Sequence, residues 1–198
     1  MIKKIAIIGA GGHGKVLGEI AQLNKYKIVH FYDDHDVNKK YIFPIKGTSK
    51  DLKKKFKYYD GFFVAIGDNS LRKKKYNWLK KFNLKIINLI HPKSILSKFT
   101  HLGSGICIMA GSVINPGVTL ENGVIINSSA SIDHDCKIEE FSHVAPNCSL
   151  AGNVIIGKNS FIGIGTSIKH QINIGKNVKV GAGSRIFKNL KNNIIFYN

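Results

Sequence analysis

An aliphatic residue recurs at every sixth position from Leu102 to Ile186, without a single insertion. A second position, four residues after each of these, holds only small or aliphatic side chains as far as Leu190. A period of six matches neither an α-helix nor the simple alternation of a β-strand. It is typical of a parallel β-helix, in which stacked coils bury one continuous core. The repeat therefore predicts a solenoid in the C-terminal half of the chain.

The N-terminal segment carries a phosphate-binding pattern instead. The sequence predicts a strand over Lys3–Ile8, the glycine-rich turn Gly9–Gly14 and a helix to about Asn24. Glycines let the backbone approach a ligand, and a helix N-terminus offers free N–H groups and a positive dipole end. A second predicted strand, Lys27–Tyr32, ends in Asp33-Asp34, at the spacing where a carboxylate binds ribose hydroxyls.

The length of this segment limits the size of the nucleotide that it can bind. A nicotinamide dinucleotide is bound by a fold with two βαβαβ halves, and only about 88 residues precede the solenoid. A single mononucleotide therefore fits better, and a tight turn that binds nothing is the remaining alternative. The other elements predicted here are a helix over Asp51–Lys57, a strand over Gly61–Ile66, a helix over Asn69–Phe82 and a strand over Lys85–Ile90.

Composition narrows the functional classes. The 30 basic against 12 acidic residues give a formal charge of +18, which suits a phosphate-bearing ligand or simple solubility. No nucleic-acid-binding signature is present, and no apolar run approaches the ~20 residues of a membrane span. The apolar run Ile5–Ala10 is also too short for a signal peptide, so a cytoplasmic protein is expected.

The three cysteines are odd in number and lack metal-ligand spacing. Cys136 and Cys148 fall on the inward register of the repeat, which predicts reduced thiols in the core. No metal is expected.

Polar residues that interrupt the repeat are the candidates for chemistry. The densest group is Asp133-His134-Asp135-Cys136, and His143 follows shortly after it. A histidine beside a carboxylate is a suitable general base near neutral pH. The alternative interpretation is that both histidines are solvent-facing turn residues.

Together these motifs resemble the sugar O- and N-acetyltransferases of the PglD/NeuD type. The resemblance covers nearly the whole chain, with the motifs in matching order. It rests on the Gly9–Gly14 turn with His13, on Asp33-Asp34, Ile66-Gly67-Asp68-Asn69, His91-Pro92, Ile132-Asp133-His134-Asp135-Cys136, Phe141-Ser142-His143-Val144-Ala145-Pro146 and Gly152-Asn153-Val154. It implies an α/β half-Rossmann-like domain over residues 1–92, which binds a nucleotide sugar. A left-handed parallel β-helix over residues 93–198 would then bind acetyl-CoA.

The resemblance also implies a homotrimer, with active sites between neighbouring β-helices. It implies that His134 is the general base and that Asp135 raises its basicity. His143, Ile164 and Ala182 would contact acetyl-CoA. The nucleotide-activated sugar would be held by Gly11, Gly12, His13, Asp33, Asp34 and Gly67.

Two positions depart from the family pattern. Ala182 stands where relatives often have glycine, and Asn192–Asn198 replaces the Gly-x-Pro-Ala-Lys-like tail that relatives carry near CoA. The predicted reaction is acetyl transfer from acetyl-CoA to the amino group of a UDP- or GDP-linked amino-deoxy sugar, in surface glycan biosynthesis. The alternatives are acetylation of a sugar hydroxyl as in sialic acids, a different acyl donor, and a non-catalytic nucleotide-sugar-binding protein.

Overall fold

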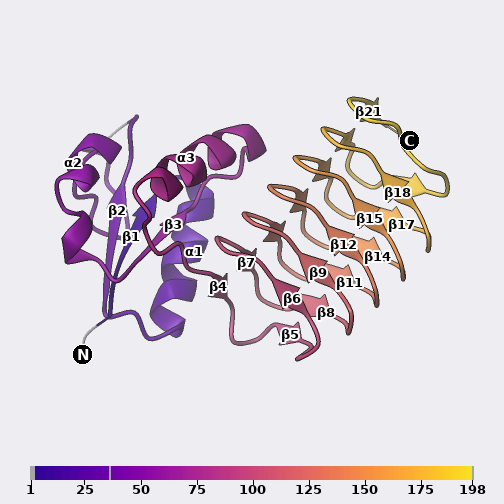
Figure 1. Cartoon of the computed structure of the whole chain (residues 1–198), viewed down its shortest axis with the longest axis horizontal. Coiled ribbons are helices and arrows are strands. Elements are labelled where there is room, and N and C mark those ends of the chain that lie inside the picture. Colours follow the sequence, from indigo (N-terminus) through magenta and orange to yellow (C-terminus); the bar gives the residue numbers. More distant parts are fainter. Residues whose placement is uncertain (1–2, 36, 198) are drawn as a thin grey trace. The chain divides into compact units, whose positions relative to one another are not determined.

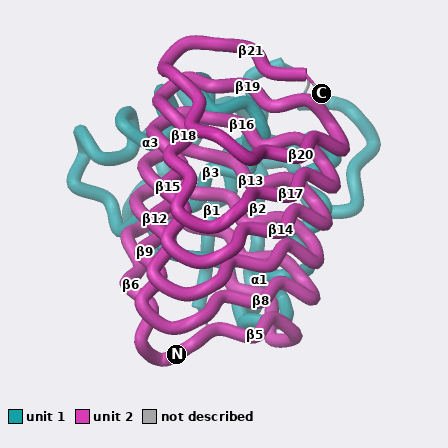
Figure 2. Tube along the Cα trace, turned by 90° about the vertical axis from the view of Figure 1, so that its right-hand side faces the viewer, with its two compact units in different colours: residues 1–89 teal, residues 90–198 magenta. Residues whose placement is uncertain are grey.

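The computed structural model describes residues 3–35 and 37–197. The chain divides into two compact units, residues 1–89 and residues 90–198, shown in teal and magenta in Figure 2. The first unit is an α/β domain and the second is a parallel β-solenoid (Figure 1). The predicted fold class is therefore confirmed.

The first unit is built around a three-stranded parallel sheet in the order β2-β1-β3. The strands are β1 (Lys4–Ile8), β2 (Ile28–Tyr32) and β3 (Gly61–Val64), and β1 in the centre has only apolar residues after its first position. Helix α1 (Gly12–Leu23) follows β1 directly and buries Leu17, Ile20 and Ala21. The predicted strand–turn–helix unit is thus present.

Helix α3 (Asn69–Lys81) follows β3 after a short loop. The carboxylate of Asp68 caps this helix by accepting a 2.7 Å hydrogen bond from the backbone N–H of Leu71. The cap stops the chain from continuing the strand to Ile66, so β3 ends two residues earlier than predicted.

Two further predicted elements differ in the structure. The helix expected over Asp51–Lys57 is divided into α2 (Ser49–Lys53) and a short 3₁₀ helix, η1 (Phe56–Tyr58). The strand expected over Lys85–Ile90 is present only in part. Only Ile86 bridges to β3, whereas β4 (Leu89–Ile90) is the first strand of a solenoid sheet.

The solenoid consists of two-residue strands that stack into three parallel sheets. Ile125 pairs with Cys107 on one side and with His143 on the other, each 18 residues away, so one coil is three hexads long. After β4 the strands are β5 (Ile95–Leu96), β6 (His101–Leu102), β7 (Cys107–Ile108), β8 (Val113–Ile114), β9 (Thr119–Leu120), β10 (Ile125–Ile126), β11 (Ser131–Ile132), β12 (Lys137–Ile138), β13 (His143–Val144), β14 (Ser149–Leu150), β15 (Ile155–Ile156), β16 (Phe161–Ile162), β17 (Ser167–Ile168), β18 (Asn173–Ile174), β19 (Lys179–Val180), β20 (Arg185–Ile186) and β21 (Ile195–Phe196).

Both inward registers of the repeat are buried as predicted. The aliphatic register is buried from Ile108 to Ile186, and only its first member, Leu102, is exposed. Most hydroxyl groups of the second register are paired between neighbouring coils. Ser142, for example, donates a 2.8 Å hydrogen bond to the carbonyl oxygen of Gly157 and accepts one from the backbone N–H of Ser160. Small polar residues are tolerated in this core because each finds a backbone partner.

A third register, at the corners of the coils, was not predicted. Every sixth residue from Gly105 to Gly183 has a positive φ near +60°. Glycine and asparagine hold most of these positions because they tolerate the left-handed conformation best. Asp135 is one of the exceptions, at φ 59°. The corner geometry of the repeat therefore fixes the backbone at the predicted catalytic pair.

Candidate active site

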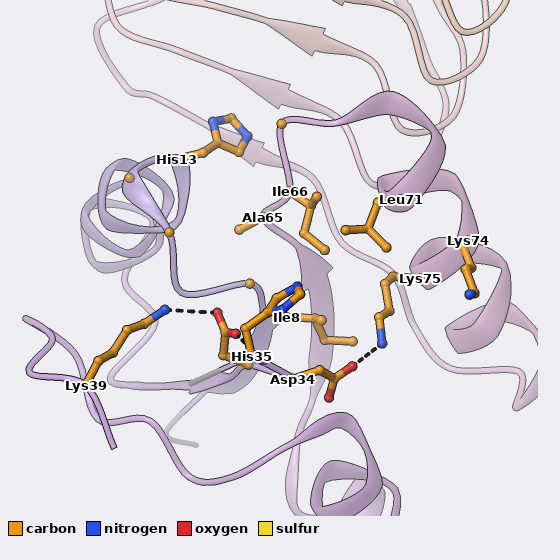
Figure 3. Close-up of a pocket in the computed structure, with 15 residues that line it drawn as sticks. Ile8, His13, Asp34, His35, Lys39, Ala65, Ile66, Leu71, Lys74 and Lys75 are labelled. Carbon is orange, nitrogen blue, oxygen red and sulfur yellow. Dashed lines mark hydrogen bonds and ion pairs between the residues drawn. The ribbon is translucent and has the colours of Figure 1, made fainter. Parts of the chain in front are cut away.

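A cavity of about 560 Å³ lies at the carboxyl ends of β1, β2 and β3 in the first unit. Figure 3 shows it between the start of α1, which carries His13, and helix α3, which carries Leu71, Lys74 and Lys75. The six predicted substrate-binding residues all line it, namely Gly11, Gly12, His13, Asp33, Asp34 and Gly67. The carboxyl edge of a parallel sheet is where open α/β folds bind their ligands.

Asp33 braces the glycine-rich turn. Its carboxylate accepts hydrogen bonds from the backbone N–H groups of Ala10 at 2.7 Å and His35 at 2.9 Å. It also forms an ion pair with the ammonium group of Lys39 at 3.3 Å. Burial acts to raise the pKa of Asp33, but these donors outweigh it and lower the pKa. The carboxylate therefore stays ionised and ties the end of β2 to the turn after β1.

Asp34 is held in a similar way by groups from α2 and α3. It accepts hydrogen bonds from the backbone N–H and hydroxyl of Ser49, at 2.7 and 3.0 Å, and pairs with Lys75 (Figure 3). Lys39 and Lys75 line the cavity but were not predicted as site residues. Lys75 lies one helical turn after Leu71, which also lines the cavity, and this spacing on α3 could have identified it.

His13 is electrically neutral at physiological pH. Burial, and then the positive charge of Arg72, lower the pKa of His13 to about 4. A neutral imidazole carries one N–H donor and one acceptor nitrogen. His13 can therefore donate a hydrogen bond to a ligand without adding a charge to the site.

In the solenoid, His134 lies in the corner between β11 and β12. Its Nδ1 is 2.8 Å from a carboxylate oxygen of Asp135, and its backbone N–H donates a 2.8 Å hydrogen bond to Asp133. Asp133 also accepts a hydrogen bond from the side-chain amide of Asn115 at 2.8 Å. The hydrogen bond to Asp135 and then the charge of Asp133 raise the pKa of His134. The side chain is 55% exposed.

Two glycines on adjacent coils make room for this pair. A Cβ atom at Gly152 would lie 2.6 Å from both Cε1 and Nε2 of His134. A Cβ atom at Gly117 would collide with the carboxylate of Asp135. Gly152 lies one 18-residue coil after His134, and Gly117 lies one coil before Asp135. Counting by coils of 18 residues would have placed both glycines beside the pair, but only the structure shows which side-chain atoms they approach.

A second groove, of about 430 Å³, lies outside the sheet that contains β13, β16 and β19. It is lined by the three predicted acetyl-CoA contacts, His143, Ile164 and Ala182. His143 is only 8% exposed; its Nε2 lies 3.0 Å from the side-chain amide of Asn127, and its ring meets Phe161 edge-on. This histidine is therefore fixed in place in the wall of the groove.

The unusual C-terminal segment takes part in this groove. β21 pairs with β19, and Ile195 and Tyr197 line the groove beside Lys179. The segment that departs from the family tail thus adds one more strand to the sheet and one more aromatic ring to the groove.

The two predicted histidines belong to different parts of the coil. His134 projects from the corner after β11, whereas His143 belongs to β13, which is part of a different sheet. Neither His134 nor Asp135 is among the described residues that line the groove beside His143. The base predicted at His134 and the groove predicted to bind acetyl-CoA therefore lie at different points on the coil.

All three cysteines are buried and none forms a disulfide, so the prediction of reduced core thiols at Cys136 and Cys148 is confirmed. Burial raises the pKa of Cys136 and Cys148 to about 11, so both remain protonated thiols at neutral pH. Within residues 3–35 and 37–197, no three His, Cys, Asp or Glu side chains gather as metal ligands. The described helices are all too short or too polar to cross a membrane.

The fold and these sites define a class of protein. Residues 4–79 match the PglD N-terminal domain, and residues 153–188 match the bacterial transferase hexapeptide, in six repeats. This combination is typical of a hexapeptide-repeat acyltransferase: an N-terminal α/β domain is followed by a hexapeptide solenoid that carries an exposed histidine–carboxylate pair.

Relatives that match over the full length narrow this class to a family. The chain is 35% identical to the acetyltransferase domain of PglB from Neisseria gonorrhoeae FA1090, solved in complex with acetyl coenzyme A, with a TM-score of 0.96 over 100% of this chain and 97% of that chain. It is 32% identical to PerB from Caulobacter crescentus, solved with CoA and GDP-perosamine, with a TM-score of 0.94 over 100% and 95% of the chains. It is also 28% identical over 178 residues to the GDP-perosamine N-acetyltransferase of Escherichia coli O157:H7, covering 84% of this chain and 78% of that protein. The chain belongs to the PglD-type family of sugar acetyltransferases.

Proposed function

We propose that the protein transfers the acetyl group of acetyl-CoA to the amino group of a nucleotide-linked amino sugar. The observation that carries this proposal is the full-length match to PglB and PerB, whose structures hold acetyl-CoA and CoA with GDP-perosamine. The cavity of the first unit offers lysines and a glycine-rich turn to a nucleotide, and the groove beside His143 offers an apolar channel to pantetheine. The proposal extends to a cytoplasmic enzyme of surface glycan biosynthesis.

In the proposed mechanism, His134 is the general base. Asp135 accepts the Nδ1–H bond, which leaves the lone pair on Nε2 free to take a proton from the attacking amine. The amine nitrogen forms a bond to the thioester carbonyl carbon as that proton leaves. Collapse of the tetrahedral intermediate then breaks the carbon–sulfur bond, and the imidazolium returns the proton to the departing CoA thiolate. Backbone N–H groups would stabilise the intermediate oxyanion.

The experiment that tests this function is an acceptor panel. UDP-, GDP- and CMP-linked amino sugars, and the same sugars with a hydroxyl in place of the amine, are incubated with acetyl-CoA. Release of the CoA thiol and the mass of the product are measured. We expect an amide product that survives mild base. A base-labile ester would favour the alternative of sugar O-acetylation, and binding without CoA release would favour a non-catalytic protein.

We further propose that the enzyme is a homotrimer with sites shared between chains. The supporting observation is that His134 and the groove beside His143 belong to different faces of one solenoid. If His134 is paired with a neighbour's groove, two inactive variants should complement each other. His134→Ala lacks the base, and Ala182→Trp blocks the groove.

Co-expressed with different tags and purified as mixed oligomers, these two variants are expected to regain a substantial part of the activity. Such oligomers contain interfaces where an intact His134 faces an intact groove. Light scattering on the same samples gives the oligomer mass. No recovery from verified mixed oligomers would mean that each site lies within one chain.

The raised pKa of His134 gives an expected pH dependence. The base must be neutral to act, so kcat/KM should fall as the pH drops through a pKa above the ordinary value of about 6.5. Asp135→Asn removes the negative charge from Nδ1 and should move this acid limb to lower pH. It should also lower the plateau rate, because the amide can donate to Nδ1 and favour the tautomer with a proton on Nε2.

The pH profiles of the wild type and Asp135→Asn are compared with the same acceptor, so protonation of the acceptor amine affects both equally. A shift of the acid limb between the two is therefore due to the enzyme. Identical limbs would contradict the role of Asp135.

A further inference from the structure

Arg72 is a buried cation in the first turn of α3. The residue is only 1% exposed. Its guanidinium donates hydrogen bonds to the carbonyl oxygens of Ile66 at 3.1 Å and Gly67 at 2.9 Å, and to the side-chain oxygen of Asn69 at 2.8 Å. These acceptors all belong to the loop between β3 and α3 or to the first residue of the helix. A guanidinium suits this task because its donors form a rigid planar fork.

The loop held by Arg72 is a wall of the nucleotide cavity. Ile66 and Gly67 line the cavity, whereas Arg72 lies behind them and is not among its described lining residues. A Cβ atom at Gly67 would meet nothing within 4 Å, so the loop backbone faces open space at this point. By drawing both carbonyl oxygens toward α3, Arg72 prevents them from presenting negative dipoles to a ligand.

The charge of Arg72 also reaches the opposite wall. It lowers the pKa of His13 on the first turn of α1, after the larger effect of burial. His13 follows the glycine-rich turn, whose N–H groups and helix dipole favour an anion. A buried cation is screened by water far less than a surface lysine. The positive potential that Arg72 produces between Gly67 and His13 is therefore only weakly screened by solvent and salt.

We propose that Arg72 is a positioning residue for the diphosphate of the nucleotide sugar: it holds the Ile66–Gly67 wall in place and supplies a fixed positive charge behind it. The proposal rests on the proposed function, because it assumes a nucleoside diphosphate in this cavity. Arg72 acts through the loop and through its field, without touching the ligand. Its loss should therefore weaken recognition of the diphosphate selectively, leaving recognition of the nucleoside and of acetyl-CoA.

The test compares Arg72→Lys and Arg72→Met with the full-length wild type by titration calorimetry. UDP and GDP probe the diphosphate, and uridine and guanosine probe the nucleoside alone. Arg72→Met should weaken binding of the better diphosphate by about 10- to 100-fold, the order of an attraction between separated charges at an effective dielectric constant of about 20. Arg72→Lys keeps the positive charge but lacks the planar set of guanidinium donors. It should therefore lose less affinity for the diphosphate than Arg72→Met. Lys80→Met removes an exposed cation from the same helix and is the matched control.

Steady-state kinetics give a second readout. The KM for the nucleotide sugar should rise in both Arg72 variants, while the KM for acetyl-CoA stays at the wild-type value. If Arg72→Met does not fold, Arg72→Lys and Asn69→Ala carry the test, because Asn69→Ala removes only one acceptor of the guanidinium.

The outcomes separate this inference from the proposed function. A wild type that binds no nucleoside diphosphate and acetylates no nucleotide sugar would overturn the proposed function. A wild type that binds one, with folded Arg72 variants that bind it equally well, would overturn the role of Arg72 alone. Equal weakening of nucleoside and diphosphate binding would also overturn that role, because such a pattern indicates general damage to the cavity.

Discussion

Replacing His134 with alanine is expected to lower kcat by about 10²–10⁴-fold, the usual contribution of one general base. The imidazole is exposed, its Nδ1 is held by Asp135 at 2.8 Å, and its backbone is held by Asp133 at 2.8 Å. Alanine removes the acceptor of the amine proton but leaves both substrate cavities intact. The KM for acetyl-CoA and for the nucleotide sugar should therefore change little.

The matched control for this variant is His101→Ala. His101 is an exposed histidine on β6 of the same solenoid and has no place in the proposed mechanism. It should retain wild-type turnover. Activity is measured by CoA release on oligomers of verified mass. An intact His134→Ala oligomer with near-wild-type turnover would show that another group takes the proton.

Gly152→Ala is expected to lower kcat by about 10- to 100-fold, since a misplacement of about 1 Å at a reacting group can cost 10²-fold. The added methyl group would lie 2.6 Å from Nε2 of His134, so the ring must turn or shift. The backbone itself accepts alanine here, because Gly152 is absent from the positive-φ positions of the solenoid. The expected defect is therefore catalytic, with a melting temperature close to that of the wild type.

A double-mutant cycle checks the cause of this defect. In the His134→Ala background the ring is absent, so Gly152→Ala should have little further effect on turnover. If Gly152→Ala lowers activity by the same factor in both backgrounds, it acts through something other than the imidazole. Unchanged turnover in the single variant would mean that the ring has room to move without loss.

Much of the fold could be predicted from the sequence because the solenoid repeats a local rule. Each inward side chain packs against the equivalent residues of the neighbouring coils. The six-residue repeat therefore already identifies the residues that form the core. The glycine-rich turn between a strand and a helix is equally local. The same regularity placed His134 and Asp135 at one corner and His143 on a different strand of the coil.

The features that could not be predicted from the sequence depend on contacts between residues far apart in the chain. The strand predicted over Lys85–Ile90 has suitable residues, yet the chain forms only a bridge to β3 there before entering the solenoid. Asp33 appears in the sequence as a candidate ribose ligand, and only the structure shows it tied to Ala10, His35 and Lys39.

The sequence by itself determined the architecture, the family resemblance and the residue types of the site, because repeats and short motifs are encoded locally. Tertiary structure alone decided how those residues are supported. Arg72 holds the cavity wall because the loop before α3 turns its carbonyl oxygens toward the guanidinium. Gly152 makes room for the imidazole of His134 because coils stack 18 residues apart. These roles arise from side chains meeting the backbone across space, and a local sequence pattern does not record which groups will meet.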